Sequence, residues 1–565
     1  MKFKKGTFLL TLLVMLGLVL AACGGGADDS ADGDKGAGGE GATEEVEQVL
    51  NFVNGDTIPT MDSSLATDQY AFEFLGATME GLYRLSEGGE IVEGIAYDHE
   101  ISEDGLTWTF FLRDDAKWSN GDPVTAHDFV YAWRRAVDPN TGSEYGPYMM
   151  NGVIKNADKV NAGELPVEEL GVEAKDDYTL VVHLENPVPY FESLTAFGTF
   201  YPLNQEFVES QGDKYAQSTE NLIFNGPFTL ENWSTTANEW SIVKNPNYWD
   251  ADNVTLERAN FVVVKEHQTA VDLYEQGEVD RVGLSSEQVD VYANHPDFTI
   301  LPEASVFYLK FNQERNGEET PLANKNLRKA IAMAIDKEAY VNNILNNGSM
   351  VATGLIPKGF VEVPGTGEDF REANGDLIVY DPDAAKEYWE KAKQELGVDT
   401  VELELLGGDS ELSIETNEYF KNQIETTLDG VKVTIKSVPF AQRLDLDNKQ
   451  DYDIQVAGWG PDYLDPNTFL NLWVTGGGNN KMSFSNEEYD RLINEAATTY
   501  AQDQEKRYQN FLEAEKILME EAAIAPLYQR QRALLVSPKI EGILHNQVGA
   551  DYDYKWAKVV PVEEE

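Results

Sequence analysis

The sequence predicts an α/β fold, and two observations carry that prediction. First, residues 401–406 and 431–438 fit strands, and the stretch between them has the length of a helix, which is the spacing of a βαβ crossover. Second, apolar residues recur at helical spacing over 326–346, and again after Ser485. Hydrophobic residues make up 42% of the 565 and charged residues 25%, as in globular proteins of several domains.

The first part of the folded region predicts strands and turns. Residues 108–112 and 180–184 are short apolar runs that fit strands. Turn signals lie between them, among them Asp104-Gly105 and Asn120-Gly121-Asp122-Pro123. We therefore expect a mixed unit of strands and turns over 81–190.

The later part contains the helices with the clearest boundaries. A glycine follows the apolar residues of 326–346, so one helix is expected there. Asp381-Pro382 has the residue types of an N-cap and a first helical position, and Gly397 is expected to end that helix. Ser485 and Glu488 fit a capping box before another helix. We expect the apolar faces of these helices to be core.

The chain is strongly acidic, with 43 Lys and Arg against 99 Asp and Glu and a net charge of −56. Nucleic-acid binding needs cationic side chains that displace counterions from phosphate, so no nucleic-acid partner is expected. Binding to anionic lipid through a basic patch is disfavoured for the same reason. The six histidines are scattered, and the sequence contains neither HExxH nor CxxC, so neither a metal site nor a cofactor is expected.

Residues 1–22 have the pattern of an export signal. Lysines precede an apolar run that is short for a membrane span. The run ends in Leu20-Ala21-Ala22-Cys23, which resembles a bacterial lipobox and contains the only cysteine of the chain. That resemblance implies lipidation of Cys23; the alternative is a signal peptide with an incidental cysteine. Residues 23–48 are rich in Gly, Ala, Asp and Glu, and we expect a disordered acidic tether there.

Six segments follow one another along the chain: Glu80-Gly81-Leu82-Tyr83, the stretch from Trp108 to Val130, Asn225-Gly226-Pro227-Phe228, Asn245-Pro246-Asn247-Tyr248-Trp249, Leu327-Arg328-Lys329-Ala330 and Gly458-Trp459-Gly460-Pro461-Asp462-Tyr463. In this order they resemble the peptide-binding lipoproteins of bacterial ABC importers, the family of oligopeptide- and dipeptide-binding proteins. Any one segment is a weak signal, whereas the ordered set over about residues 50–560 is a strong one.

The resemblance implies a bilobal fold like that of periplasmic binding proteins, with a hinge between the lobes and a third, smaller domain. The first lobe would be discontinuous and formed by residues 49–80, 190–303 and 526–565. The smaller accessory domain would be residues 81–189, and the second lobe would be residues 304–525.

A protein that accepts many peptides should bind the groups that all peptides share. Strand addition pairs with the backbone whatever the side chains are, and a carboxylate placed for the α-ammonium then fixes the register. The resemblance implies that Asp462 is this carboxylate. It follows a predicted strand that ends near Ala457, where α/β sheets place ligand contacts. The alternative is a solvated turn residue.

Gly458 and Gly460 flank Trp459, and glycine permits the close approach of another backbone. The two glycines either admit a peptide strand or only shape a turn. The resemblance favours Trp459 as the wall of a side-chain pocket over Trp459 as core. Tyr145 matches a family position that contacts the peptide, and a surface tyrosine is the alternative.

Two further assignments come from alignment alone. Thr67, Asp68 and Gln69 align, counting back from Glu80, with a segment whose backbone pairs with the peptide. Phe440 falls where the family often has an aromatic pocket residue, and core packing is an equal alternative.

The sequence departs from the family at the end of the binding site that would hold a peptide carboxylate. Members that clamp short peptides often place basic residues just before the segment that corresponds to residues 458–463 here, which we call the tryptophan motif. Here residues 444–458 contain only Lys449, with Arg443 just outside. We therefore expect tolerance of longer peptides or of a C-terminus that projects outward.

The resemblance thus implies a substrate-binding subunit rather than an enzyme. It would be tethered to the extracellular face of the cell membrane in the Gram-positive manner, act as a monomer, capture oligopeptides as its lobes close, and deliver them to permease subunits. A GxxxxGK[ST] motif is absent, so ATP hydrolysis would belong to other subunits. A receptor for signalling peptides and a binder of another solute are alternatives. A secreted hydrolase is disfavoured because GxSxG is absent and Cys23 would be lipidated.

Overall fold

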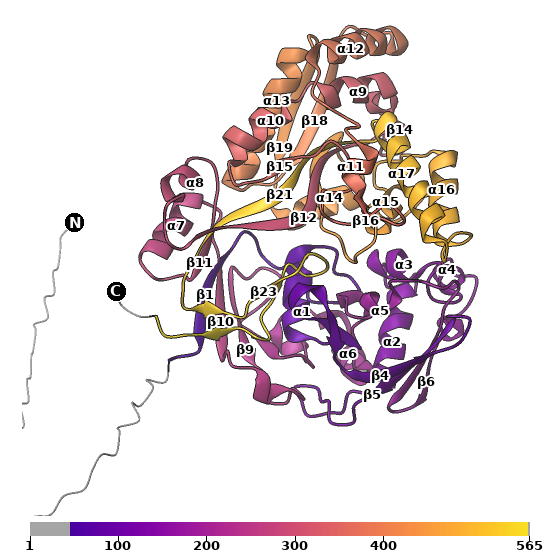
Figure 1. Cartoon of the computed structure of the whole chain (residues 1–565), viewed down its shortest axis with the longest axis vertical. Coiled ribbons are helices and arrows are strands. Elements are labelled where there is room, and N and C mark those ends of the chain that lie inside the picture. Colours follow the sequence, from indigo (N-terminus) through magenta and orange to yellow (C-terminus); the bar gives the residue numbers. More distant parts are fainter. Residues whose placement is uncertain (1–45, 563–565) are drawn as a thin grey trace, which may run out of the picture. The chain divides into compact units, whose positions relative to one another are not determined.

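An eleven-stranded sheet runs through the folded body, which the computed structural model describes over residues 46–562 (Figure 1). Two long central strands, β12 (Phe298–Phe311) and β21 (Ile524–Val536), pair antiparallel. On one side of this pair the order continues through β20 (Ile454–Trp459), β18 (Val401–Gly407) and β19 (Val431–Ser437). On the other side it continues through β11 (Arg281–Leu284), β1 (Val49–Asn54), β10 (Arg258–Val263), β9 (Glu239–Lys244) and β8 (Phe228–Glu231). The short β15 (Met350–Val351) pairs with β21 outside this order.

Two large buried cores lie on the two sides of the central strand pair and define two lobes. The first core extends from Leu50 to Phe261 and includes Tyr552, near the end of the chain. The second extends from Ala304 to Tyr528. Helices of the second lobe are α9 (Lys325–Met333), α10 (Lys337–Tyr340), α12 (Pro382–Leu396), α13 (Glu411–Thr427), α14 (Phe440–Asn448), α16 (Glu487–Ala497) and α17 (Gln504–Glu520). The bilobal α/β fold expected from the sequence is confirmed.

A smaller antiparallel sheet packs within the core of the first lobe. It contains β4 (Ala96–Ile101), β5 (Thr107–Leu112), β7 (Thr179–His183) and β6 (Val172–Asp176), in that order. The strands predicted at 108–112 and 180–184 are β5 and β7. Helices of this side of the protein include α1 (Gln69–Thr78), α2 (Ala126–Val137), α3 (Tyr145–Met150) and α7 (His267–Glu275). Figure 1 shows this small sheet far from α12 and α13 of the second lobe.

The predicted βαβ crossover is present in the second lobe. Strands β18 and β19 run parallel, with Val401 opposite Val431, and α13 connects them. Helix α12 has the predicted ends: the Asp381 carboxylate accepts hydrogen bonds from the first turn, and Gly397 at φ 68° closes the helix. These boundaries were predictable because each one depends on a single local residue.

Two sequence predictions about helices are wrong. The single helix expected over 326–346 is interrupted, because Asp336 has an extended backbone and its carboxylate accepts from the amide of Ala339, starting α10 anew. The N-cap before α16 is Asn486 rather than Ser485; its side chain accepts from two backbone amides of the first turn.

The central strand pair is irregular at two places. The pairing of β12 with β21 shifts register between Pro302 and Val306, and Glu303 lies in this interval. A second shift lies between Phe307 and Tyr308. Breaks of this kind bend and twist the strand that contains them, so we expect the bend of the shared sheet over residues 302–308.

The folded body begins slightly earlier than the boundary expected at 49. The side chain of Gln48 donates to the carbonyl of Val559 at 3.0 Å and accepts from its amide at 2.9 Å. The predicted signal peptide over 1–22 and the lipidation site Cys23 lie outside the described residues. Within residues 46–562, none of the helices is long and apolar enough to cross a membrane.

Candidate functional site

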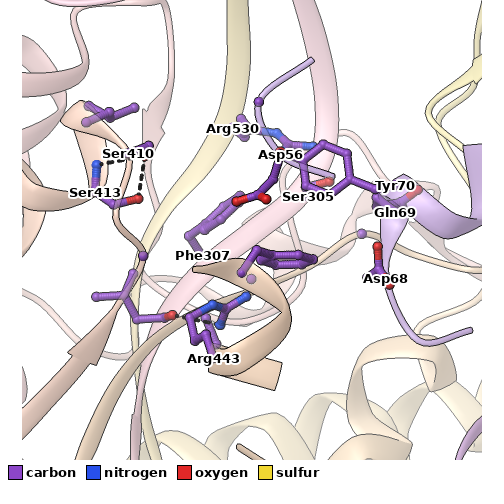
Figure 2. A pocket seen from close by; sticks show the side chains of 18 of the residues that line it. Asp56, Asp68, Gln69, Tyr70, Ser305, Phe307, Ser410, Ser413, Arg443 and Arg530 are labelled. Atoms are coloured by element: carbon purple, nitrogen blue, oxygen red, sulfur yellow. Dashed lines mark hydrogen bonds between the residues drawn. The ribbon is translucent and has the colours of Figure 1, made fainter. Parts of the chain in front are cut away.

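A cavity of about 670 Å³ lies between the two lobes. That volume is within the usual range for small-molecule sites. The first lobe contributes the end of β1 and the start of α1; the second contributes the start of α14 and the strand segment 455–460. Figure 2 shows side chains from both lobes, including Asp68, Phe307 and Arg443, around this space.

Of the residues expected to bind a ligand, the cavity lining includes all but one: Thr67, Asp68, Gln69, Tyr145, Phe440, Gly458, Trp459 and Gly460. Segments that are hundreds of residues apart in sequence are therefore brought together. The exception is Asp462, which borders a smaller neighbouring cavity of about 40 Å³.

The two glycines of the tryptophan motif have different surroundings. Gly458 lies in β20 opposite Phe307 of β12, and a Cβ at this position would be 2.7 Å from the Phe307 ring. At Gly460 a Cβ would be 3.0 Å from the Ser305 hydroxyl and 3.1 Å from the Gln69 amide. Gly458 thus belongs to a strand rather than a turn, and its missing side chain makes room for an aromatic wall of the cavity.

An aromatic stack joins the two lobes beside the cavity. The rings of Tyr145 and Trp459 lie 6.0 Å apart and nearly parallel, and Tyr145 also stacks on Phe197 at 5.8 Å. Tyr148 meets the Trp459 ring edge-on at 5.8 Å. Tyr145 is buried, so the alternative of a surface tyrosine is excluded. Aromatic pairs of this geometry stabilise contacts beyond the area they bury.

Asp462 is buried behind this stack, with 4% of its surface exposed. Tyr145 and Thr468 donate to its carboxylate in long contacts of 3.5 Å. Among the described residues, no basic side chain lies within 4.0 Å of it. Burial raises the pKa of Asp462 to about 8, while the contacts with Tyr148, Thr468 and Tyr145 act in the opposite direction. The solvated-turn alternative is therefore wrong.

Asp68 and Gln69 present unpaired atoms at the opposite wall of the cavity. One oxygen of Asp68 caps α1 by accepting from the amide of Ala71 at 3.1 Å, and burial raises its pKa to about 6. The Gln69 amide donates to the carbonyl of Gly549 at 3.0 Å. The second oxygen of Asp68 and the oxygen of Gln69 are buried without a partner in the described part of the chain. Buried acceptors of this kind are available to donors of a ligand.

Phe440 begins α14 at the edge of the cavity. Its ring meets Tyr70 edge-on at 5.3 Å, so the contact spans the two lobes. It is half-buried rather than enclosed, which favours the pocket interpretation over core packing.

Ion pairs also join the lobes around the cavity, and no sequence motif predicted them. Lys265 contacts Asp409 across the cleft at 2.7 Å and Asp56 of its own lobe at 3.2 Å. Lys481 pairs with Glu144. Because the chain contains 99 acidic residues, no pattern in the sequence could single these out.

At the register shift of the central strands, Glu303 is held by two arginines of β21. The side chains of Arg530 and Arg532 both donate to its carboxylate and also contact Asp551. Burial alone would raise the pKa of Glu303, but the two guanidinium groups hold it well below its usual range. The interlobe crossing is thus fixed by a buried charge cluster.

Within residues 46–562, no set of three or more His, Cys, Asp or Glu side chains is arranged to bind a metal ion.

Two lobes joined by a shared sheet, with a cavity between them, define a bilobal solute-binding protein. The chain belongs to the bacterial extracellular solute-binding proteins of family 5, whose middle region matches residues 90–481.

Relatives match along nearly the whole chain. The dipeptide-binding protein of Lactococcus lactis is 34% identical over 570 residues, which cover 99% of this chain and 100% of that protein. Listeria monocytogenes OppA, solved bound to peptide, is 45% identical with a TM-score of 0.88 and covers 91% of this chain and 100% of its own. The pheromone receptor PrgZ is 35% identical with a TM-score of 0.87, at coverages of 91% and 100%.

A protein solved in two forms bears on the lobe arrangement. The murein tripeptide-binding protein MppA of Escherichia coli superposes with a TM-score of 0.80 in one structure and 0.59 in its unliganded open form. Its sequence identity to this chain is nearly the same in the two comparisons, at 28% and 29%. The difference between the two TM-scores therefore reflects a difference in conformation. The lobes here are arranged unlike those of the open form, in agreement with the ion pairs that cross the cleft.

Proposed function

We propose that this protein is the substrate-binding subunit of an ABC importer and that it captures oligopeptides in the cavity between its lobes. The observation that carries the proposal is the buried carboxylate of Asp462 behind the Tyr145–Trp459 stack, without a cationic partner in the described residues. An α-ammonium is the cation that every linear peptide supplies. The peptide-bound OppA structure of Listeria, at 45% identity, supports the same ligand class.

Binding and closure would be coupled through the cavity walls. A peptide backbone would donate to the free oxygens of Asp68 and Gln69 in the first lobe. It would lie along the end of β20 in the second lobe, where Gly458 and Gly460 flank Trp459. Contacts with both lobes exist only when the lobes are together, so the peptide stabilises the closed state by its differential affinity for it. The closed form would then dock on permease subunits. No bond is made or broken in this cycle, so the proposed role is not enzymatic.

We also propose boundaries for the moving parts, the same as those expected from the sequence. We propose residues 49–80, 190–303 and 526–565 as the first lobe, 81–189 as the accessory domain and 304–525 as the second lobe. The register shift near Glu303 supports a hinge at the junction of the first and second lobes.

The ligand class is tested by native mass spectrometry of the purified protein, before and after unfolding and refolding. We expect a mixture of peptides to be released on unfolding, and the refolded protein to bind peptides from a synthetic library. A single non-peptide species, or a refolded protein that ignores the library, would overturn the peptide assignment and leave the fold intact. Cleavage of the library peptides would instead favour the hydrolase alternative.

Two parts of the proposal concern the cell. The protein would act as a monomer, anchored through lipid on Cys23 at the extracellular face of a Gram-positive-type membrane. Mass spectrometry of the mature N-terminus checks this: we expect a diacylglyceryl cysteine, and release of Cys23→Ala into the medium.

A role as receptor for signalling peptides is the second candidate, and the likeness to PrgZ favours it specifically. A receptor would show a narrow preference for one peptide, whereas an importer subunit would release many. The same mass-spectrometric experiment therefore separates the two roles.

A further inference from the structure

The small cavity of about 40 Å³ that borders Asp462 is closed in large part by one loop near the end of the chain. The loop connects β23 (Leu544–His545) to β24 (Tyr552–Asp553), and we call its residues 546–551 the back-wall loop. Its members that line the small cavity are Asn546, Gly549 and Ala550. A polar cavity of this size can hold a water molecule, so its walls decide whether bulk solvent reaches the Asp462 carboxyl group from this side.

The base of the back-wall loop is anchored without help from the tryptophan motif. The amide of Asn546 donates to the carbonyl of Asp551 at 3.0 Å, which closes the loop on itself. The Asp551 carboxylate binds Arg530 and Arg532 of β21, the arginines of the charge cluster at the crossing between the lobes. The loop is therefore fixed to the central strand pair.

The tip of the loop contacts both sides of the cleft. The amide of Gly549 donates to the carbonyl of Pro461 at 2.9 Å, and the carbonyl of Gly549 accepts from the Gln69 side chain at 3.0 Å. Val548 packs against the core of the second lobe. Because Pro461 directly precedes Asp462, the bond from Gly549 holds the backbone that carries the carboxyl group. That bond joins the two lobes, so it exists only while they are together.

The charged groups that face Asp462 across the small cavity bind one another. Arg84 donates to Asp553 at 2.6 Å and to Glu80 at 2.9 Å, and the Tyr201 hydroxyl donates to a backbone carbonyl at 3.2 Å. None of them supplies Asp462 with a partner. Water that entered from this side would raise the local dielectric constant and weaken the attraction between the carboxylate and an ammonium group. A wall that excludes water therefore strengthens that bond.

We propose that the back-wall loop is a positioning element for the peptide ammonium group: through Gly549 it holds Pro461 and Asp462 in place, and it keeps solvent from the carboxyl group. This inference rests on the proposed peptide-binding function. Gly549 has a φ of 74°, a conformation that residues with a Cβ rarely adopt. A Cβ there would meet only ordinary contacts, the nearest with the Phe197 ring at 3.8 Å. Alanine at this position would therefore disturb the loop backbone without a steric clash.

Isothermal titration calorimetry on ligand-stripped protein tests the proposal with one alanine pentapeptide in free-amino and N-acetylated forms. The ratio of the two affinities measures the bond to the ammonium group. We expect Gly549→Ala to lower this ratio about 2- to 10-fold, the range for one hydrogen bond. Gly277→Ala is the matched control, because Gly277 also has a positive φ, of 72°, has open space around an added Cβ, and lines neither cavity. Its ratio should equal that of the wild type.

Hydrogen exchange in the wild-type protein tests the same contact without a variant. The Gly549 amide has its acceptor on the tryptophan motif, whereas the Asn546 amide bonds within the loop. Two-dimensional NMR of protein with isotope-labelled glycine and asparagine follows both amides. We expect the free-amino peptide to slow exchange at Gly549 by about 10-fold or more, because opening of the lobes exposes it, and to change exchange at Asn546 less than about two-fold.

Four results would overturn the inference and leave peptide binding intact. The first is an equal loss for both peptide forms in Gly549→Ala, and the second is the same fall of the ratio in Gly277→Ala. The third is an unchanged exchange rate at Gly549 when peptide binds. The fourth is a wild-type protein that binds both peptide forms equally. If the wild-type protein binds neither form, the proposed function fails together with this inference.

Discussion

Replacing Asp462 by asparagine tests the central assignment, because the change removes the charge and keeps the shape. In this arrangement of the lobes the carboxyl group is buried, has a pKa raised to about 8, and has only long contacts of 3.5 Å to hydroxyl groups. We therefore expect Asp462 to be mostly neutral at pH 7 when no cation lies beside it. A peptide ammonium is still charged at that pH and would convert the carboxyl group to its ionised form.

The magnitude of the effect on affinity follows from the bond that is lost. A hydrogen bond to a charged group contributes about 1.5–3 kcal/mol, which is about 10- to 150-fold in Kd. We expect Asp462→Asn to weaken peptides with a free amino terminus by this amount. N-acetylated peptides lack the ammonium group and should bind the wild-type and variant proteins almost equally.

The same variant has an opposite effect on stability. The pKa of Asp462 is higher in the folded protein than in an unfolded chain, so the folded protein binds more protons between about pH 4 and pH 8. The stability of the ligand-free protein is therefore lost as the pH rises through that window. Asparagine does not titrate, so the variant should melt at a higher temperature than the wild type at pH 8, and the difference should shrink towards pH 4.

Calorimetry in two buffers of different ionisation enthalpy measures both the peptide affinity and the number of protons released on binding. At pH 7 the wild-type protein should release most of one proton for each peptide bound, and Asp462→Asn should release none from this position. Equal losses of affinity for free and acetylated peptides would refute the assigned role. Binding without proton release in the wild type would refute the buried, neutral carboxyl group on which the reasoning depends.

Three other substitutions probe the cavity walls and the crossing between the lobes. Gly458→Ala should displace the Phe307 ring and lower stability in urea unfolding by about 1–3 kcal/mol, and an unchanged midpoint would contradict the contact. Lys265→Met removes an ion pair across the cleft, so stopped-flow dissociation of peptide should be about two- to five-fold faster at low salt; an unchanged rate counts against a role in closure. Glu303→Gln leaves Asp551 as the remaining carboxylate of Arg530 and Arg532 and should destabilise the protein by about 1–3 kcal/mol in the same urea assay; an unchanged midpoint would contradict a stabilising role of the cluster.

Local signals in the sequence predicted those parts of the fold that depend on neighbouring residues. The alternation of 431–438 and the caps Asp381 and Gly397 each identify one element, and the structure confirms them. The break at Asp336 was missed because apolar spacing continues on both sides of it. The extended backbone at that residue and the cap that its carboxylate makes to the amide of Ala339 separate the two helices in the structure.

The site was predictable where a motif marks it and unpredictable where distant charges meet. The segment with Trp459 was found because its residues are contiguous. Lys265 and Asp409 are 144 residues apart, and neither is unusual in its own surroundings. Arg443 lies one residue before the range 444–458 that was searched for basic residues, so the sequence did not place it in the site. In the structure it belongs to the first turn of α14 and lines the cavity, as does Phe440 at the start of that helix.

The sheet shared by β12 and β21 has a consequence for folding. Neither lobe has a complete sheet of its own, because the long strands supply ladder partners on both sides. A fragment cut near residue 303 would expose open strand edges, which pair readily with other chains. Although chains of this length commonly unfold domain by domain, we expect one cooperative transition for residues 46–562. The lobes are the proposed units of motion, whereas the whole sheet is the expected unit of folding.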